Sequence, residues 1–142
     1  MADIWSREKR SEVMSKIKGH DTKPELAVRS LLHRMGYRFT VHAPNNRKLP
    51  GRPDIVLPKY NAVIFVHGCF WHRHKNCKIA STPKTRENYW QKKFAANVAR
   101  DKRNTRKLRH SGWHVLVVWE CEVAKEDKLA AKLEHKIVAT LQ

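Results

Sequence analysis

The chain has 142 residues, 41% of them apolar, and carries 30 lysine and arginine residues against 13 acidic ones, a formal net charge of +17. This length fits a single domain, residues 1–142, with a real core, and no apolar run approaches the ~20 residues that a membrane helix needs. Such an excess of positive charge opposes compactness unless a polyanion neutralises it, and nucleic acid is the commonest such partner. We therefore expect a soluble, cytoplasmic protein that binds nucleic acid and no membrane; a basic protein without that partner is the weaker alternative.

In the first half of the chain, the sequence predicts a basic arm followed by a more clearly indicated helix. Residues 1–20 are rich in lysine and arginine and thin in apolar side chains, so we interpret them as an arm or short helix that orders on a partner. Asp21 or Thr22 can cap the next helix, and Gly36 ends it. Residues 37–41 alternate apolar with polar side chains and predict a strand, after which a loop, residues 43–53, leads to Asp54.

The second half predicts strands and helices in alternation. Two apolar strands, residues 54–57 and 62–66, are followed by a long basic helix at about 85–110 and by a buried strand at 114–119. Strand, long helix and strand indicate a right-handed crossover between parallel strands, hence an α/β fold with a small mixed sheet and helices on both faces. The apolar stripes of the last two helices are Trp90, Phe94 and Val98 on the first, and Leu129, Leu133, Ile137 and Leu141 on the second.

Asp54 begins a strand whose hairpin partner ends at Val66 and His67. Magnesium-dependent hydrolysis of a phosphodiester needs an anionic oxygen ligand, an open coordination position and an activated water. Many nucleases place a second carboxylate and a lysine on the second strand. Here that stretch is Phe65-Val66-His67, so the backbone carbonyl of Val66 would have to replace the carboxylate. Taken alone, the dipeptide Pro-Asp is typical of a turn. Only the residues around Asp54 favour its interpretation as a metal ligand.

A loop of residues 67–77 combines cysteines with histidines. An odd number of cysteines, three in the chain, cannot form a closed disulfide set, and a reducing compartment favours free thiols or metal ligands. Cys69, Cys77 and a distant Cys121 offer three of the four ligands that structural zinc takes, and either His72 or His74 could be the fourth. Three protein ligands with a water would instead make the zinc catalytic; three incidental cysteines are the remaining alternative.

Two adjacent aromatic side chains, Phe70 and Trp71, lie within that loop. Neighbouring side chains usually diverge, so we expect at most one of them to pack inward. Aromatic side chains beside basic residues are suited to stacking on bases or wedging between them. Trp90 could join them or could belong to the core.

From end to end the chain resembles the very-short-patch (Vsr) DNA mismatch endonucleases. The resemblance rests on six segments: 21–25 (DTKPE), 49–54 (LPGRPD), 63–72 (VIFVHGCFWH), 83–86 (PKTR), 97–101 (NVARD) and 118–121 (VWEC). It implies a restriction-endonuclease-like core and an enzyme that nicks one strand of duplex DNA 5′ of the thymine in a T:G mismatch. Such mismatches arise when 5-methylcytosine deaminates, and the nick starts very short patch repair. A T:G wobble stacks less well than a matched pair, so opening it costs less.

The same resemblance implies roles for individual residues. Asp54 and the Val66 carbonyl would bind catalytic Mg²⁺, and His72 would activate water. Glu25 would be a further active-site acid, and His67 would assist with the phosphate. The ligands of a structural Zn²⁺ would be Cys69, His74, Cys77 and Cys121.

The resemblance also implies contacts and partners. Phe70, Trp71 and Trp90 would form a wedge beside the mismatch, with Met14 inserted from the opposite groove. Lys93 and Asn97 would read the mismatched pair. The partner is double-stranded DNA with a T:G mismatch, possible further partners are mismatch-repair proteins, and the enzyme is expected to be a monomer. Two other classes share part of this pattern: a zinc-stabilised DNA-binding module without catalysis, and a restriction-type endonuclease that cuts both strands.

Overall fold

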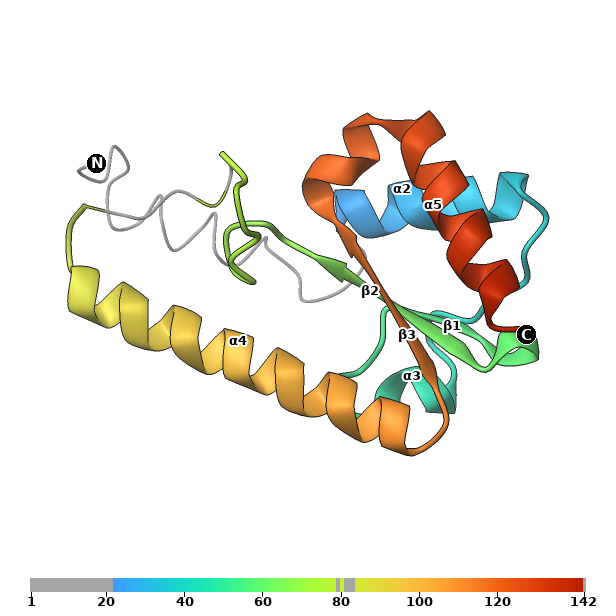
Figure 1. The fold of residues 1–142 in the computed structure, drawn as a ribbon, viewed down its shortest axis with the longest axis horizontal. Coiled ribbons are helices and arrows are strands. Elements are labelled where there is room, and N and C mark those ends of the chain that lie inside the picture. The colour runs from blue at the N-terminus through green and yellow to red at the C-terminus, as the bar shows by residue number, and fades with distance from the viewer. Residues whose placement is uncertain (1–21, 79, 81–83, 142) are drawn as a thin grey trace.

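A three-stranded sheet forms the centre of the computed structural model, which describes residues 22–78, 80 and 84–141 (Figure 1). The strands are β1 (Ile55–Leu57), β2 (Ala62–His67) and β3 (His114–Trp119), in the order β1-β2-β3. β1 runs antiparallel to β2, and β3 runs parallel to β2. The predicted mixed sheet is therefore confirmed, and so are its three strands to within a residue at each end. The predicted arm, residues 1–20 with Met14, lies outside the described residues.

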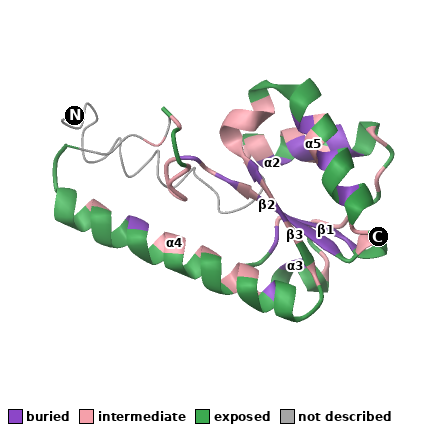
Figure 2. Ribbon diagram, viewed as in Figure 1, coloured by how far each residue is buried: buried purple, intermediate pink, exposed green. Residues whose placement is uncertain are grey.

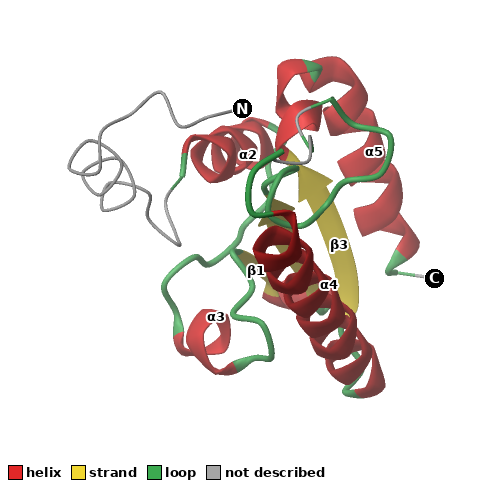
Figure 3. Ribbon diagram, turned by 90° about the vertical axis from the view of Figure 1, so that its left-hand side faces the viewer, coloured by secondary structure: helices red, strands yellow, loops and turns green. Residues whose placement is uncertain are grey.

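Helices cover the two faces of this sheet. α2 (Lys23–Arg34) and α5 (Glu126–Ala139) lie on one face, and the long α4 (Glu87–His110) lies on the other (Figures 1 and 3). α4 connects β2 to β3, as the strand, helix, strand pattern predicts. In the described part of the chain, no helix combines the length and the apolar character needed to cross a membrane.

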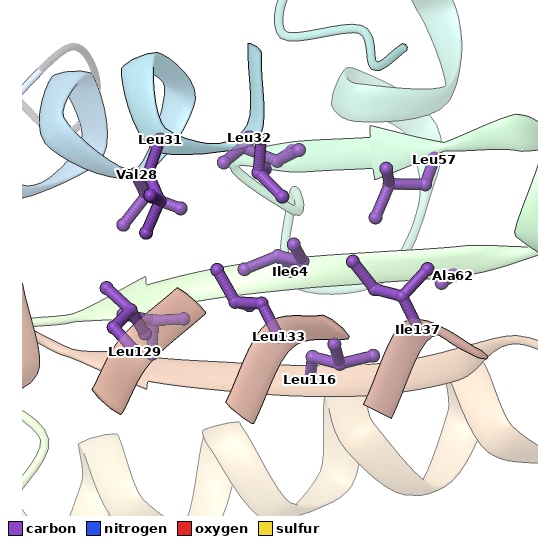
Figure 4. Packing of buried hydrophobic residues seen from close by; sticks show 12 residues of the cluster. Val28, Leu31, Leu32, Leu57, Ala62, Ile64, Leu116, Leu129, Leu133 and Ile137 are labelled. Atoms are coloured by element: carbon purple, nitrogen blue, oxygen red, sulfur yellow. The ribbon is translucent and has the colours of Figure 1, made fainter. Parts of the chain in front are cut away.

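The main core lies between the sheet and the pair α2 and α5 (Figures 2 and 4). Its side chains come from α2, from the sheet and from α5: Val28, Leu31, Leu32, Ile55, Leu57, Ala62, Ile64, Leu116, Val118, Leu129, Leu133 and Ile137. Leu141 was expected on the same stripe of α5 but is 63% exposed. The helix ends at Ala139, where the Thr140 hydroxyl donates to the Ile137 carbonyl at 2.7 Å, so the helical spacing no longer applies to Leu141.

A smaller core lies under α4 and consists of Val56, Val63, Phe65 and Leu108. Most other side chains of α4 are exposed, and Phe94 is the buried member of the predicted stripe, with Trp90 and Val98 half-buried. α4 thus packs on the sheet through its C-terminal half and leaves room beside the ends of β2 and β3.

The predicted strand at residues 37–41 is wrong, and the predicted loop 43–53 contains a short helix, α3 (Pro44–Lys48). Within residues 37–41 only Thr40 pairs, in an isolated antiparallel bridge to Val56. The buried Asn46 side chain accepts from the Thr40 hydroxyl at 2.8 Å and donates to the carbonyls of Thr40 and Pro53 at 3.0 and 3.1 Å. These bonds tie Thr40 and Pro53 to α3, while the apolar side chains of the segment 37–41 pack against the core.

Candidate active site and metal centre

A cleft of about 840 Å³ opens where α2 begins, β1 begins, β2 ends and α4 passes. Its walls include most of the predicted catalytic residues: Glu25, Asp54, Val66, His67 and His72, and also Phe70 and Trp71. The topology explains this meeting, because the N-terminus of β1 and the C-terminus of β2 lie at the same end of an antiparallel pair.

Asp54 is fixed from both sides. The Asn46 side chain donates to its carbonyl at 3.4 Å, and its carboxylate Oδ2 accepts from the backbone N–H of Val66 at 2.7 Å. The N–H and C=O of one strand residue point to the same edge, so the Val66 carbonyl also faces the β1 side, beyond the residue at which β1 begins. An acidic side chain and a main-chain carbonyl therefore lie at one edge of the cleft.

Glu25 lies in the first turn of α2, whose N-cap is Thr22. Its side chain is buried, 3% exposed, and Arg29 Nη2 contacts its Oε2 at 3.3 Å. Burial raises the pKa of Asp54 to about 7, the Val66 N–H opposes this, and the adjacent Glu25 carboxylate raises it further. The neighbouring carboxyl groups of Asp54 and Glu25 are both partly or fully buried, and such a pair is stabilised by a shared proton or by a cation. Their hard oxygen donors fit magnesium.

His67 and His72 form a stacked pair, with ring centroids 3.9 Å apart and planes at 4°. His67 ends β2, and burial lowers its pKa to about 4, with His72 adding to this effect. His72 comes from the following loop, and its Nδ1 lies 2.5 Å from Oδ2 of Asp101 on α4. A carboxylate on one ring nitrogen fixes the ring orientation and leaves the other nitrogen available for chemistry.

Asp101 is the site residue to which sequence reasoning gave no role. It appeared only within the segment 97–101 on which the family resemblance rests. One indication was available: Asp101 and the N-terminal Glu87 are the two acidic residues of α4, and Asp101 stands between Arg100 and Lys102. An isolated acid in a basic helix needs a local reason, and His72 provides it.

Four predicted ligands lie together at a second place. The donor atoms of Cys69, His74, Cys77 and Cys121 all lie within 4.8 Å of one another. His74 Nδ1 is 3.6 Å from Cys69 Sγ and 3.4 Å from Cys121 Sγ. Metal–sulfur bonds of 2.3 Å and metal–nitrogen bonds of about 2.0 Å in a tetrahedron place sulfur and nitrogen about 3.5 Å apart. The donor set therefore fits a tetrahedral ion, and the histidine among these donors is His74.

The local backbone brings Cys121 to this cluster. A 3-10 turn, Glu120–Ala124, follows β3 directly, and the N–H of Cys69 donates to Glu120 Oε1 at 2.9 Å. Burial raises the pKa of the Cys69 thiol to about 12. A cation among these donors would favour the thiolate instead.

Trp119, the last residue of β3, connects the two clusters. Its ring stacks on His74 at 4.2 Å and 11°, and meets His67 edge-on at 5.3 Å and 74°. The cysteine–histidine cluster and the stacked histidines are therefore parts of one packed unit.

The aromatic side chains gather at the N-terminal half of α4. Phe70 and Trp71 do not diverge, since their rings meet edge-to-face at 5.1 Å, but neither is fully buried, in line with the expectation that at most one packs inward. Phe70 also contacts the rings of Trp90 and Phe94, at 5.8 and 5.2 Å. The ring surfaces offered by α4 explain this packing, and Phe70 and Trp71 still line the cleft.

Lys93 and Asn97 lie at the edge of this aromatic group. Lys93 Nζ is 5.4 Å from the Trp71 ring centroid, and Asn97 Nδ2 donates to the Trp71 carbonyl at 3.4 Å. In this structure both residues thus contact the aromatic loop. Their predicted contacts with a base pair stay a prediction.

The chain is similar in sequence to known proteins. The family model of the DNA mismatch endonuclease Vsr matches residues 2–78. The chain is 43% identical over 129 residues to the DNA mismatch endonuclease Vsr of Escherichia coli K12, covering 91% of this chain and 80% of that one. It is 48% identical over 135 residues to the type II nicking enzyme V.XorIIP of Xanthomonas oryzae, covering 95% and 96%.

A solved structure supports the fold. The catalytic domain of the homing endonuclease I-Bth0305I superposes with a TM-score of 0.58 at 21% identity, covering 86% of this chain and all of that one. Its likeness supports the expected endonuclease-like core. By its sequence, this chain belongs to the DNA mismatch endonuclease Vsr family.

Proposed function

We propose that this chain is a DNA endonuclease that nicks one strand of duplex DNA 5′ of the thymine in a T:G mismatch and so starts very short patch repair. The observation that carries the proposal is the cleft that Asp54 and Glu25 line together with the stacked pair His67 and His72. Its relatives include a DNA mismatch endonuclease and nicking enzymes. One active site suffices for a single-strand nick, so we expect the protein to act as a monomer.

Asp54 and the Val66 carbonyl would hold a magnesium ion, with Glu25 beside them. When bound, the ion supplies a Lewis acid for the scissile phosphodiester. Asp101 holds the His72 ring through Nδ1, so that Nε2 of His72 can take a proton from the attacking water. Stacking against His67 holds the His72 ring in its orientation. A ring N–H of His67 can also donate a hydrogen bond to a phosphate oxygen.

Cys69, His74, Cys77 and Cys121 would hold zinc as a structural ion, because four protein donors leave no open position. Their role is to fix the loop that carries His72 and the aromatic pair Phe70 and Trp71. With Trp90, these rings would form the wedge that opens the duplex at the mismatch. Met14, Lys93 and Asn97 would add contacts on the bases, and mismatch-repair proteins are further candidate partners.

Labelled duplexes that differ in one pair test the proposal. With magnesium, we expect a T:G duplex to be cut in one strand only, 5′ of the thymine, because the wobble pair is the easiest to open. The matched C:G duplex and reactions in EDTA should stay intact. The readout is the strand and position of the cut on a denaturing gel. Cutting of both strands in either duplex would indicate a restriction-type enzyme, and binding without any cut would indicate a DNA-binding module.

Asp101→Asn tests the orientation of His72. The amide keeps the shape of the carboxylate but not its charge, so we expect the nicking rate to fall about a hundredfold or more. Metal content and the unfolding midpoint should change little, because the amide fills the same space and the side chain, 23% exposed, still reaches solvent. The matched control is Glu87→Gln, the other acid of α4, which is exposed. Nicking at the wild-type rate in Asp101→Asn would remove this pair from the mechanism.

A further inference from the structure

A second cavity, of about 990 Å³, lies between α4, β3 and the loop that follows β2. It shares His67, His72, Asp101 and Thr105 with the cleft described above, but neither Asp54 nor Glu25 lines it. The stacked histidines with Asp101 thus form a common wall of two cavities. The proposed hydrolysis uses only one of them.

The second cavity is strongly basic. Lys75, Lys102, Arg106 and Arg109 line it, and all four are exposed. None of the four has an ion pair with an acid among the described residues. The acid in the lining is Asp101, whose carboxylate already binds His72. Four cations around one cavity, with no acidic partner in the described part of the chain, favour an anionic ligand.

Part of the remaining lining is apolar and aromatic. Val98 of α4 and Val117 and Trp119 of β3 contribute to it. Along α4, residues 98, 102, 105 and 109 recur at helical spacing, so one face of the helix presents both the valine and the cations. A site of this size with apolar surface and a few charged groups is typical of small-ligand cavities. Aromatic surface beside cations is the usual combination for single-stranded nucleic acid, whose bases stack while its phosphates pair.

A peptide strand is a poorer fit. β3 is an edge strand of the sheet, and an open edge invites strand addition. Here Lys132 Nζ of α5 donates to the Val117 carbonyl at 3.0 Å and also binds Glu122 at 2.8 Å. A lysine on the edge opposes pairing with another chain. A ligand can therefore reach the side chains that line the cavity, but not pair with the backbone edge of β3.

We propose that this second cavity binds a short segment of single-stranded nucleic acid, at a site separate from the cleft that holds Asp54. Its phosphates lie against Lys102, Arg106 and Arg109, and a base rests on the apolar floor with Trp119. A free nucleotide has the same chemistry at smaller size. The occupied cavity places a ligand directly behind the histidine pair.

Binding of labelled hexathymidylate to the full chain in EDTA, followed by fluorescence anisotropy, tests this site. The test variant is Arg106→Glu with Arg109→Glu. The matched control is Arg103→Glu with Lys107→Glu, an equal charge change at exposed positions of α4 that line neither cavity. We expect the test variant to bind about tenfold more weakly or worse, and the control about as the wild type. The slope of log K against log salt concentration should become less steep by about 1.4, because each of the two lost phosphate contacts accounts for about 0.7. Equal weakening in both pairs would mean diffuse attraction and would overturn the proposal.

Competition separates the two cavities and the two sources of ligand. A saturating T:G duplex should leave the hexanucleotide bound; displacement would mean that both use the cleft and would overturn the proposal. If the natural ligand is a strand, thymidine monophosphate should compete weakly. If the natural ligand is a free nucleotide, it should compete as strongly as unlabelled hexamer. Equal competition by hexaglutamate would show charge alone and would also overturn it. At saturating duplex, nicking of a short T:G duplex by the test variant should match that of the Arg103→Glu, Lys107→Glu control, which shows that the test variant is folded. A variant that fails this check is replaced by Arg106→Gln with Arg109→Gln.

Discussion

Asp54→Ala is expected to abolish nicking of a T:G duplex while leaving duplex affinity within about threefold. Several kcal/mol of charge stabilisation at the phosphate would be lost with the metal ligand, which corresponds to about a thousandfold or more in rate. Affinity should persist, because it comes mainly from the lysines and arginines rather than from this half-buried acid. Single-turnover nicking and gel-shift titration of the same preparation measure the two quantities.

A second substitution separates charge from shape at this position. Asp54→Asn keeps an oxygen to accept from the Val66 N–H, which lies 2.7 Å from the carboxylate. We expect it to be as inactive as Asp54→Ala but more stable, by about 1 kcal/mol, because the buried N–H keeps its partner. Asp127→Asn, at an exposed acid of α5, is the control. Nicking retained in Asp54→Asn would show that the negative charge is not required and would contradict the metal-ligand role.

The sequence predicted the strands and the long helix because apolar runs and stripes carry that information directly. It failed at residues 37–41, where alternation reflected contact with the core and not strand pairing. The deciding residue there is Asn46, a buried amide bonded to Thr40 and Pro53. A single polar side chain that holds two loop segments together through their carbonyls leaves no periodic trace in a sequence.

The candidate site was predictable in its residue types but less so in its geometry. Spacing allowed either His72 or His74 to join the cysteines, and the fold places His74 with Cys69 and Cys121. Asp101 was missed because its partner lies 29 positions away, across a loop and half of α4. Contacts of this kind depend on how α4 lies against the end of β2, which local patterns do not encode.

Cys121→Ser tests the cysteine–histidine cluster and should release the loop of residues 69–77 while the core stays folded. We expect most of the bound zinc to be lost, because serine is a poor ligand and three remaining donors leave the site open. The main core lies between α2, α5 and the sheet and does not include the loop, so circular dichroism should still show the helices. Residues 69–77 should become sensitive to protease, since metal binding and local folding are one free energy.

Nicking should fall with the zinc in Cys121→Ser, even though this residue does not line the cleft. The path is the packed series His74, Trp119, His67 and His72, in which each ring contacts the next. Cys121→His, which keeps a zinc-binding side chain, should retain more metal and more activity than Cys121→Ser. If elemental analysis finds a full zinc complement in Cys121→Ser, Cys121 is not a ligand. If zinc is lost and nicking persists, the loop holds His72 without the ion.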